Sequence, residues 1–272
     1  MRGVRKLPPG CVLRAKNGRV VSLRRYWDLR PPASPLGEGE AIERVRALIE
    51  DAVRSHLESD VPVGAFLSGG LDSSTVVAQM AAQGRAPHTF SIGFDARDFD
   101  ELAWARRVAA RFGTRHEEEV VTAGCWQALD EIIPALDEPF ADVSAIPTWF
   151  VSRLAARRVK VVLSGDGGDE VFAGYKTYAA TRLAGLYRRT VPSPLRSLVA
   201  WGVNRLPVSH GKVSFDYMAK RFVAGASNDA VDAHFSWKAI FDEAGKQALY
   251  REPRAVGPTV RLYHEAVAGI DP

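Results

Sequence analysis

The spacing of apolar and polar residues changes several times along the 272-residue chain. Near the amino terminus, the alternating segments CVLRAK and RVVSL flank Asn17-Gly18, which is a strong signal for a tight β-hairpin turn. Residues 30–39 are rich in proline and glycine and predict a linker. Beyond the linker, apolar residues recur at steps of three and four, which indicates an amphipathic helix. Its expected apolar stripe contains Ile42, Val45, Leu48, Ile49, Ala52, Val53 and Leu57.

From residue 60 onward, short apolar runs alternate with longer helical patterns. The strands that we expect are VGAFL, HTFSIGF, HEEEVVT and VKVVL, at residues 63–67, 88–94, 116–122 and 159–163. The expected helices cover residues 73–83, 100–112, 125–136 and 146–157. Strands that alternate with helices indicate βαβ units, so the pattern predicts an α/β fold with a parallel sheet and helices on both faces. Residues 176–272 show no convincing strand pattern and are expected to be mainly helical.

Composition is ordinary for a globular protein, with 46% hydrophobic and 25% charged residues. No apolar run approaches the roughly 18 residues of a membrane span, and no secretory signal is recognisable, so we expect a cytoplasmic protein without membrane contact. The two cysteines, Cys11 and Cys125, indicate reduced thiols rather than a disulfide framework. The net charge of +4 suits small anionic substrates. Basic residues without interleaved aromatic residues argue against nucleic-acid binding.

The segment SGGLDSS, residues 68–74, directly follows the first expected strand of the sheet. Ligands of open parallel sheets bind at the carboxyl ends of strands, and glycines before a helix N-terminus favour phosphate. The segment lacks both the lysine of a Walker loop and the GxGxxG fingerprint. It contains Asp72 instead. A carboxylate beside a phosphate is unfavourable unless a cation such as Mg2+ bridges the two negative groups. A simple N-cap formed by Asp72 or Ser73 is the alternative.

The segment SGDGGDEVFAGY, residues 164–175, repeats this arrangement after another expected strand. A serine and glycines are followed by the carboxylates of Asp166, Asp169 and Glu170. Two such loops can face each other across one crevice, which makes Asp72 and Asp169 candidate magnesium ligands. The alternative is an acidic surface turn, but three neighbouring carboxylates without a cation repel one another.

Together, SGGLDSS and SGDGGDEVFAGY resemble the synthetase domain of glutamine-dependent asparagine synthetases, a branch of the ATP-pyrophosphatase (PP-loop) proteins. DEPFADVSAIPTWF, residues 137–150, is also similar to that family, and GVRKLPPGCVL with RRYWDL resembles the end of its glutaminase domain. The resemblance implies an adenine nucleotide alpha hydrolase-like fold. It also implies that residues 1–33 are a remnant of the glutaminase domain and linker, and that residues 36–272 are a synthetase domain truncated at its carboxyl end.

The same resemblance implies a reaction in which ATP is cleaved between its α- and β-phosphates. Aspartate is activated as β-aspartyl-AMP, and ammonia, derived from glutamine in a full-length protein, then displaces AMP. Asp72 and Asp169 match the family's magnesium carboxylates, and Asp166 matches an acidic position tied to formation and breakdown of the intermediate. The resemblance leaves open a homodimer of the full-length protein. The implied ATP-binding residues are Leu67, Ser68, Gly69, Gly70, Asp72, Ser73, Ile92, Ser164 and Gly165.

Other functions remain open from the sequence. A related amidotransferase acting on another carboxylate, similar to a β-lactam synthetase or to a sugar- or polymer-modifying enzyme, would have the same loops, because the loops bind ATP. A tRNA-modifying PP-loop enzyme would need basic or cysteine-rich elements, and a non-catalytic ATP-binding fragment is a further alternative. Arg2 stands where the family's glutaminases have a cysteine, and no segment matches the family's phosphate-stabilising lysine. We therefore expect this chain to be inactive alone.

Overall fold

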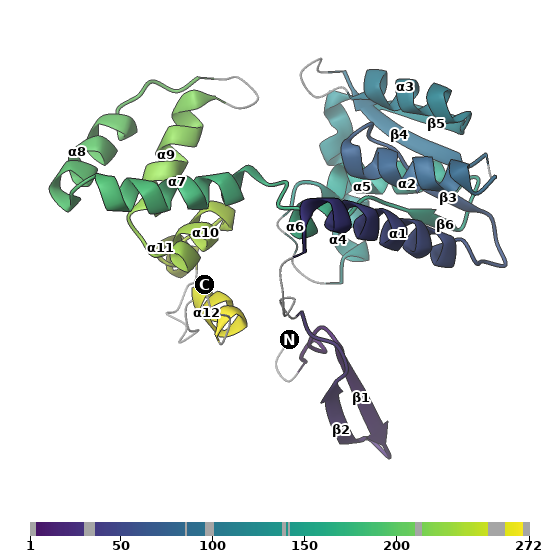
Figure 1. Ribbon diagram of the computed structural model, residues 1–272, viewed down its shortest axis with the longest axis horizontal. Coiled ribbons are helices and arrows are strands. Elements are labelled where there is room, and N and C mark those ends of the chain that lie inside the picture. The colour runs from purple at the N-terminus through teal and green to yellow at the C-terminus, as the bar shows by residue number, and fades with distance from the viewer. Residues whose placement is uncertain are drawn as a thin grey trace. The chain divides into compact units, whose positions relative to one another are not determined.

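The computed structural model describes residues 4–29, 36–84, 86–95, 101–137, 140, 142–209, 214–249 and 259–268 (Figure 1). Residues 30–35 of the predicted linker lie outside the described residues. The chain divides into two compact units, residues 1–48 and 49–272. None of the helices in the described ranges has the length and apolar character needed to cross a membrane.

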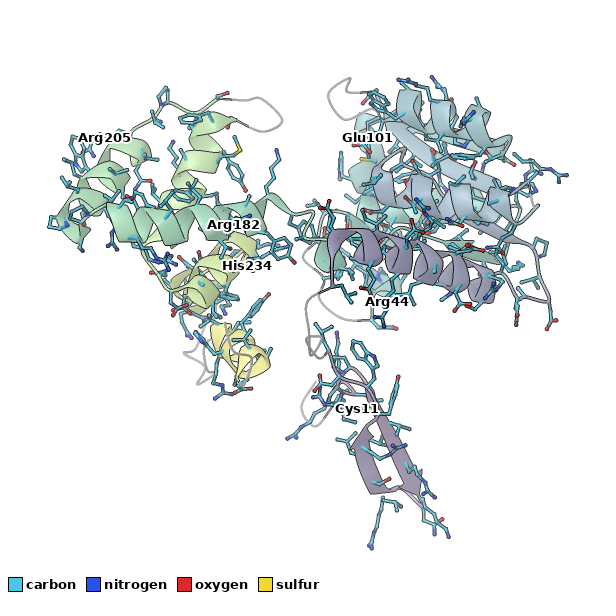
Figure 2. The ribbon with its side chains drawn as sticks, in the orientation of Figure 1. Cys11, Arg44, Glu101, Arg182, Arg205 and His234 are labelled. Atoms are coloured by element: carbon cyan, nitrogen blue, oxygen red, sulfur yellow. The ribbon has the colours of Figure 1, made fainter. Side chains whose placement is uncertain are left out.

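The first unit contains the predicted hairpin. Strands β1 (Cys11–Lys16) and β2 (Arg19–Arg25) pair antiparallel. Asn17 and Gly18 have φ angles of 52° and 71°, as a two-residue turn between twisted strands requires. The hairpin prediction is therefore confirmed. Cys11 lies in β1 (Figure 2), and Cys11 and Cys125 are both free thiols, as expected.

Helix α1 (Glu38–His56) begins a few residues before the expected apolar stripe. Only the carboxyl-terminal part of that stripe is buried: Val53 and Leu57 belong to the core of the second unit, whereas Ile42 and Leu48 are exposed. The helix prediction is confirmed, but the predicted stripe overstates how much of the helix is covered.

The second unit contains a four-stranded sheet in the order β5-β4-β3-β6. Its strands are β3 (Val63–Phe66), β4 (His88–Phe94), β5 (Arg115–Val121) and β6 (Val161–Leu163). All neighbouring pairs are parallel, and Ala65 of β3 is opposite Leu163 of β6. The predicted parallel sheet is confirmed. Because β3 and β6 are neighbours, the loops that follow them begin at the same edge of the sheet.

Helices cover both faces of this sheet (Figure 1). On one face, Ala65 and Leu67 pack with α1, α2 (Leu71–Ala82) and α3 (Leu102–Phe112). On the other face, Phe66 and Phe90 pack with α5 (Ala145–Ala155). Adjacent strand residues point to opposite faces, so Ala65 and Phe66 belong to different cores. Helices on both faces, as the pattern predicts, are thus observed.

Ion pairs attach α3 and α5 to the edge strand β5. Arg106 of α3 contacts Glu118 at 2.5 Å, while Arg153 of α5 contacts Glu119 at 3.0 Å from the opposite face. Hydrogen bonding to Arg106 lowers the pKa of Glu118. Exposed ion pairs contribute little net stability, so their main effect is to orient the two helices that form the walls of the site.

Two helical segments differ from the expectation. Residues 125–136 were expected to form one helix, but a 3-10 helix, η2 (Ala123–Ala128), precedes a short α4 (Leu129–Ala135) that contains Pro134. Pro134 lacks an amide hydrogen, and α4 ends one residue later, at Ala135. A four-residue helix, α6 (Gly168–Val171), lies within the second glycine-rich loop and has no clear signal in the sequence pattern.

Beyond the second loop, the described residues are mainly helical, as predicted. They form α7 (Lys176–Thr190), α8 (Ser193–Asn204), α9 (Phe215–Ala226), α10 (Ala230–Lys238), α11 (Glu243–Leu249) and α12 (Val260–Val267). Ala184, Ala226, Ala233 and Trp237 form a separate core among α7, α9 and α10. The Trp237 indole N–H donates to the carbonyl of Arg221 at 2.9 Å, so this buried polar group has a partner.

Candidate functional site

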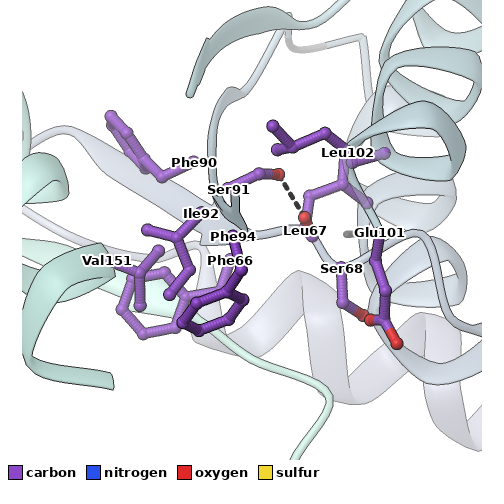
Figure 3. A pocket seen from close by; sticks show the side chains of 11 residues that line it. Phe66, Leu67, Ser68, Phe90, Ser91, Ile92, Phe94, Glu101, Leu102 and Val151 are labelled. Carbon is purple, nitrogen blue, oxygen red and sulfur yellow. Dashed lines mark hydrogen bonds between the residues drawn. The ribbon is translucent and has the colours of Figure 1, made fainter. Parts of the chain in front are cut away.

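An apolar cavity of about 400 Å³ lies at the carboxyl ends of β3 and β4 (Figure 3). Its polar lining consists of Ser68, Ser91 and Glu101. The remaining walls are apolar, and they come from the two strands, α3 and α5. The cavity therefore suits a flat apolar ring with few polar attachments. The apolar lining consists of Phe66, Leu67, Phe90, Ile92, Phe94, Leu102, Ala105 and Val151.

A second, polar cavity of about 270 Å³ adjoins the first, because Phe66 and Ser68 line both. This second cavity collects residues from both glycine-rich loops and one residue from α5. An apolar cavity beside a hydroxyl-rich and acidic one matches the apolar base and the polar phosphates of a nucleotide. The full lining is Phe66, Ser68, Gly70, Asp72, Ser73, Thr148, Ser164, Gly165 and Asp166.

The first loop is shaped by glycine and serine. Gly69 has a φ of +78°, and a Cβ there would lie 2.6 Å from the backbone nitrogen of Ala105 in α3. A larger residue is therefore excluded both by backbone conformation and by space. The hydroxyls of Ser68 and Ser73 are 2.9 Å apart, and the amide of Gly70 donates to Ser68 Oγ at 3.2 Å. These bonds fix the loop as it enters α2.

The alternative role for Asp72 as a simple helix cap is wrong. The N-cap of α2 is Gly70, and no side chain makes a capping hydrogen bond there. The first amides of α2 therefore keep their capacity to bind an anion. The Asp72 carboxylate faces the second loop instead.

Glycines of the second loop lie directly against Asp72. A Cβ on Gly165 would lie 2.8 Å from Asp72 Cβ, and a Cβ on Gly168 would lie 2.5 Å from Asp72 Cγ. Real Cβ contacts are not this short, so only glycine permits the approach. The expected apposition of the two loops across one crevice is thus observed, and it explains why the second loop is rich in glycine.

The three carboxylates of the second loop have different surroundings. Asp166 lines the polar cavity and accepts a hydrogen bond from Ser164 Oγ at 2.9 Å. Asp169 lies against Gly174, where a Cβ would come within 2.0 Å of Asp169 Oδ1. Among the described residues, Asp72 and Asp166 line the cavity and Asp169 does not. The pairing of Asp72 with Asp169 as metal ligands therefore stays a prediction.

The third carboxylate, Glu170, is bound by a tyrosine at the end of the loop. Tyr175 Oη donates to Glu170 Oε1 at 2.6 Å. This hydrogen bond raises the pKa of Tyr175 to about 12 and lowers the pKa of Glu170. It closes the second loop on itself and directs Glu170 toward Tyr175.

The Tyr175–Glu170 bond predicts a distinct alkaline titration. The bond favours the protonated tyrosine, so its contribution to stability is complete below the ordinary tyrosine pKa and is lost as pH rises through about 12. We expect a tyrosinate absorbance component with a midpoint near 12 that Tyr175→Phe removes and Glu170→Gln shifts to lower pH. Circular dichroism over the same range monitors alkaline unfolding. A Tyr175→Phe titration that superimposes on that of the wild type would contradict the assignment.

The sequence reasoning missed three polar residues of the site, Ser91, Thr148 and Glu101, as well as most of the apolar lining; Ser91 lies in β4 and lines the apolar cavity. Thr148 of α5 lines the polar cavity, and Glu101 at the start of α3 lines the apolar one. Thr148 lies within DEPFADVSAIPTWF, where the family resemblance was the available signal. Glu101 precedes a helix whose pattern gives no indication of a ligand. Ser68, Gly70, Asp72, Ser73, Ser164, Gly165 and Asp166 lie in the polar cavity, and Leu67 and Ile92 in the apolar one.

One group of three possible metal ligands, Asp229, Asp232 and His264, occurs among the described residues, with ligand atoms within 4.8 Å of one another. Asp229 Oδ1 caps α10 by accepting from the amides of Val231 and Asp232. His264 Nε2 lies 2.7 Å from Asp232 Oδ1. A helix cap and a hydrogen bond between His264 and Asp232 account for these groups without a metal.

A parallel α/β sheet with two facing, carboxylate-bearing glycine loops at its carboxyl edge defines an α/β protein of the PP-loop type. The family model described as asparagine synthase matches residues 44–261, and the chain belongs to this family. A putative glutamine-hydrolysing asparagine synthetase of Mycobacterium tuberculosis H37Rv is 41% identical over 182 residues, which are 65% of this chain and 28% of that protein.

A second relative is a putative glutamine-hydrolysing asparagine synthetase of Methanocaldococcus jannaschii, 46% identical over 164 residues, which cover 59% of this chain and 32% of that protein. The chain thus spans only a minor part of the length of these relatives. The solved NH3-dependent NAD synthetase from Campylobacter jejuni covers 52% of this chain and 61% of its own, at 16% identity and a TM-score of 0.34.

Proposed function

We propose that the chain provides the ATP-binding synthetase part of an ATP-dependent, amide-forming ligase of the asparagine synthetase type. One observation carries the proposal: an apolar cavity shares Phe66 and Ser68 with a polar cavity that Asp72 and Asp166 also line. Family membership and relatives named asparagine synthetases support the same reading.

In this proposal the adenine ring occupies the apolar cavity, next to Leu67 and Ile92. The first loop then receives the phosphates through the free amides at the start of α2 and the hydroxyls of Ser68 and Ser73. Gly69 and Gly70 let the backbone approach the phosphate oxygens closely. Ser164 and Gly165 contact the nucleotide from the opposite side of the crevice.

The residues present also fit a magnesium ion. Mg2+ prefers oxygen ligands and is commonly held by one or two carboxylates together with phosphate oxygens. Asp72 projects between the loops, into a space that a larger residue at Gly165 or Gly168 would fill. Asp72 and Asp169 are the proposed ligands, with Asp166 close by in the same loop. When bound, the ion would neutralise negative charge on the phosphate oxygens.

The proposed reaction uses the side-chain carboxylate of aspartate as the nucleophile. A carboxylate oxygen bonds to the α-phosphorus of ATP, the bond to the bridging oxygen breaks, and pyrophosphate leaves with that oxygen. Ammonia, supplied from glutamine in a longer protein, then attacks the acyl carbon, loses a proton and displaces AMP. The loops position the α-phosphate and stabilise developing charge, and Asp166, oriented by Ser164, acts at the acyl-adenylate.

The test of this function is the identity of the products. With ATP, Mg2+, aspartate and ammonia, we expect a longer protein that contains this chain to form AMP and pyrophosphate in an aspartate-dependent reaction, measured by phosphorus NMR or chromatography. These products show which phosphoanhydride bond of ATP is cleaved, and they can be detected even when turnover is slow. Aspartate-dependent ADP and phosphate would contradict the proposal. Release of AMP with another carboxylic acid, but not with aspartate, would instead identify a related amidotransferase.

In the same assay, Asp166→Asn should lower AMP formation about 100-fold or more while leaving the affinity for Mg-ATP within a few-fold of the wild type. The isosteric change keeps an acceptor for Ser164 Oγ and removes the charge proposed to act at the acyl-adenylate. Equal losses in nucleotide affinity and in rate would show that Asp166 acts in ATP binding.

A further inference from the structure

Among the described residues, Glu101 is the one carboxylate in the lining of the apolar cavity (Figure 3), and it is labelled on the whole chain in Figure 2. It occupies the N-cap position of α3 but makes no side-chain capping hydrogen bond. Among the described residues, no hydrogen bond or ion pair of its carboxylate is found. Neither capping nor an ion pair within these residues accounts for the position of this side chain.

The other polar side chains of the apolar cavity are already engaged. Ser91 Oγ donates to the carbonyl of Leu67, a bond drawn in Figure 3. Ser68 Oγ is bonded to Ser73 Oγ and to the amide of Gly70. Glu101 therefore has the largest remaining hydrogen-bonding capacity in the cavity. An ionised carboxylate is an acceptor only, so its partner must donate.

The position of Glu101 indicates which part of a nucleotide it would meet. In Figure 3, Glu101 and Ser68 lie on the same side of the cavity, across from Ile92 and Val151. Ser68 also lines the polar cavity proposed for the phosphates. In ATP the ribose connects the base to the phosphates, so a group beside Ser68 lies at the level of the sugar.

We propose that Glu101 is a specificity-determining residue that accepts hydrogen bonds from the vicinal 2′- and 3′-hydroxyls of the ATP ribose. This inference rests on the proposed ATP site. A carboxylate has two oxygens and can accept from both hydroxyls at once, and charge-assisted bonds of this kind are stronger than neutral ones. The residue thereby distinguishes ribonucleotides from deoxyribonucleotides.

The experiment compares the binding of ATP and 2′,3′-dideoxy-ATP to the 272-residue chain by titration calorimetry in the presence of Mg2+ and the absence of aspartate. We expect the wild type to bind the dideoxy nucleotide at least about tenfold more weakly, because hydrogen bonds to charged groups are lost. Glu101→Ala should weaken ATP to a similar extent, leave dideoxy-ATP almost unchanged and abolish the discrimination. Glu101→Gln, which keeps one acceptor, should give an intermediate ratio.

Glu131→Ala, which removes an exposed glutamate of α4, is the matched control and should leave the ratio unchanged. A wild type that binds both nucleotides equally, or a Glu101→Ala variant that still discriminates, would overturn the ribose assignment while leaving ATP binding intact. Purine riboside triphosphate keeps the ribose hydroxyls but lacks the amino group of adenine. If Glu101→Ala weakens the binding of ATP but not of this analogue, Glu101 contacts the adenine amine, and the ribose assignment is overturned as well. Absence of ATP binding by the wild type would refute the proposed function itself.

Discussion

Replacing Asp72 with asparagine is expected to weaken the binding of Mg-ATP by about 100-fold or more, which corresponds to about 2.7 kcal/mol. Asparagine has nearly the shape of aspartate, so it fits beside Gly165 and Gly168 and should preserve the fold. It lacks the negative charge, however, and neutral amides are poorer ligands for magnesium than carboxylates. The affinity should therefore fall without a comparable loss in the stability of the free protein.

The measurement is the rise in melting temperature with Mg-ATP, supported by calorimetric titration, since a ligand stabilises the folded state by an amount that grows with the logarithm of the ratio of ligand concentration to Kd. In the wild type, chelation of magnesium should reduce the shift to the level seen in Asp72→Asn. The control is Asp60→Asn, an exposed aspartate ahead of β3, which should behave as the wild type. A normal magnesium-dependent shift in Asp72→Asn would exclude Asp72 as a ligand. Asp169→Asn, measured in parallel, tests whether the second predicted ligand contributes equally.

A single methyl group at Gly168 should have an effect of similar size. The Cβ of Gly168→Ala would lie 2.5 Å from Asp72 Cγ and 2.7 Å from Asp72 Oδ1. The loops must separate or the carboxylate must turn, so we expect at least a 100-fold loss in Mg-ATP affinity. Overpacking of this kind typically destabilises a fold by about 1–3 kcal/mol. Thermal unfolding with and without Mg-ATP separates the two effects.

Gly185→Ala provides the matched control, because a Cβ there meets no atom within 4 Å and Gly185 lies inside α7. It should leave binding unchanged and stabilise the helix by up to about 1 kcal/mol. The double variant Asp72→Ala with Gly168→Ala should recover the stability lost by Gly168→Ala alone, because the opposing atoms are gone, but it should not recover binding. Wild-type affinity for Mg-ATP in Gly168→Ala would refute the close approach of the two loops.

Most of the secondary structure of the sheet, and the position of the first loop, follow from local patterns. Asn17-Gly18 favours its turn because both residues adopt positive φ readily. Gly113 ends α3 in the left-handed conformation for the same reason. The strand HTFSIGF coincides with β4, because its apolar run is buried on both faces. A glycine-rich loop that follows a parallel strand must then lie at the carboxyl ends of the strands of the sheet.

The loop motifs pointed to a pair of facing loops, but the strand order is what brings them together. The order β5-β4-β3-β6 makes β6 a neighbour of β3, which brings Gly165 and Gly168 against Asp72. Periodicity records which face of an element is buried, but not which element covers it. The same limit explains why the exposed positions of Ile42 and Leu48 were not foreseen.

The sequence by itself determined most of the elements, the two loops and their chemical type, because turn conformation, strand alternation and glycine placement depend on neighbouring residues. Tertiary structure alone decided the individual partners: Asp166 shares the cavity with Asp72, Asp169 lies against Gly174, and Glu101 reaches the apolar cavity from α3. The physical reason is that a cavity is formed where segments distant in the chain meet. Its lining therefore depends on strand order and helix packing, and no local pattern encodes either of them.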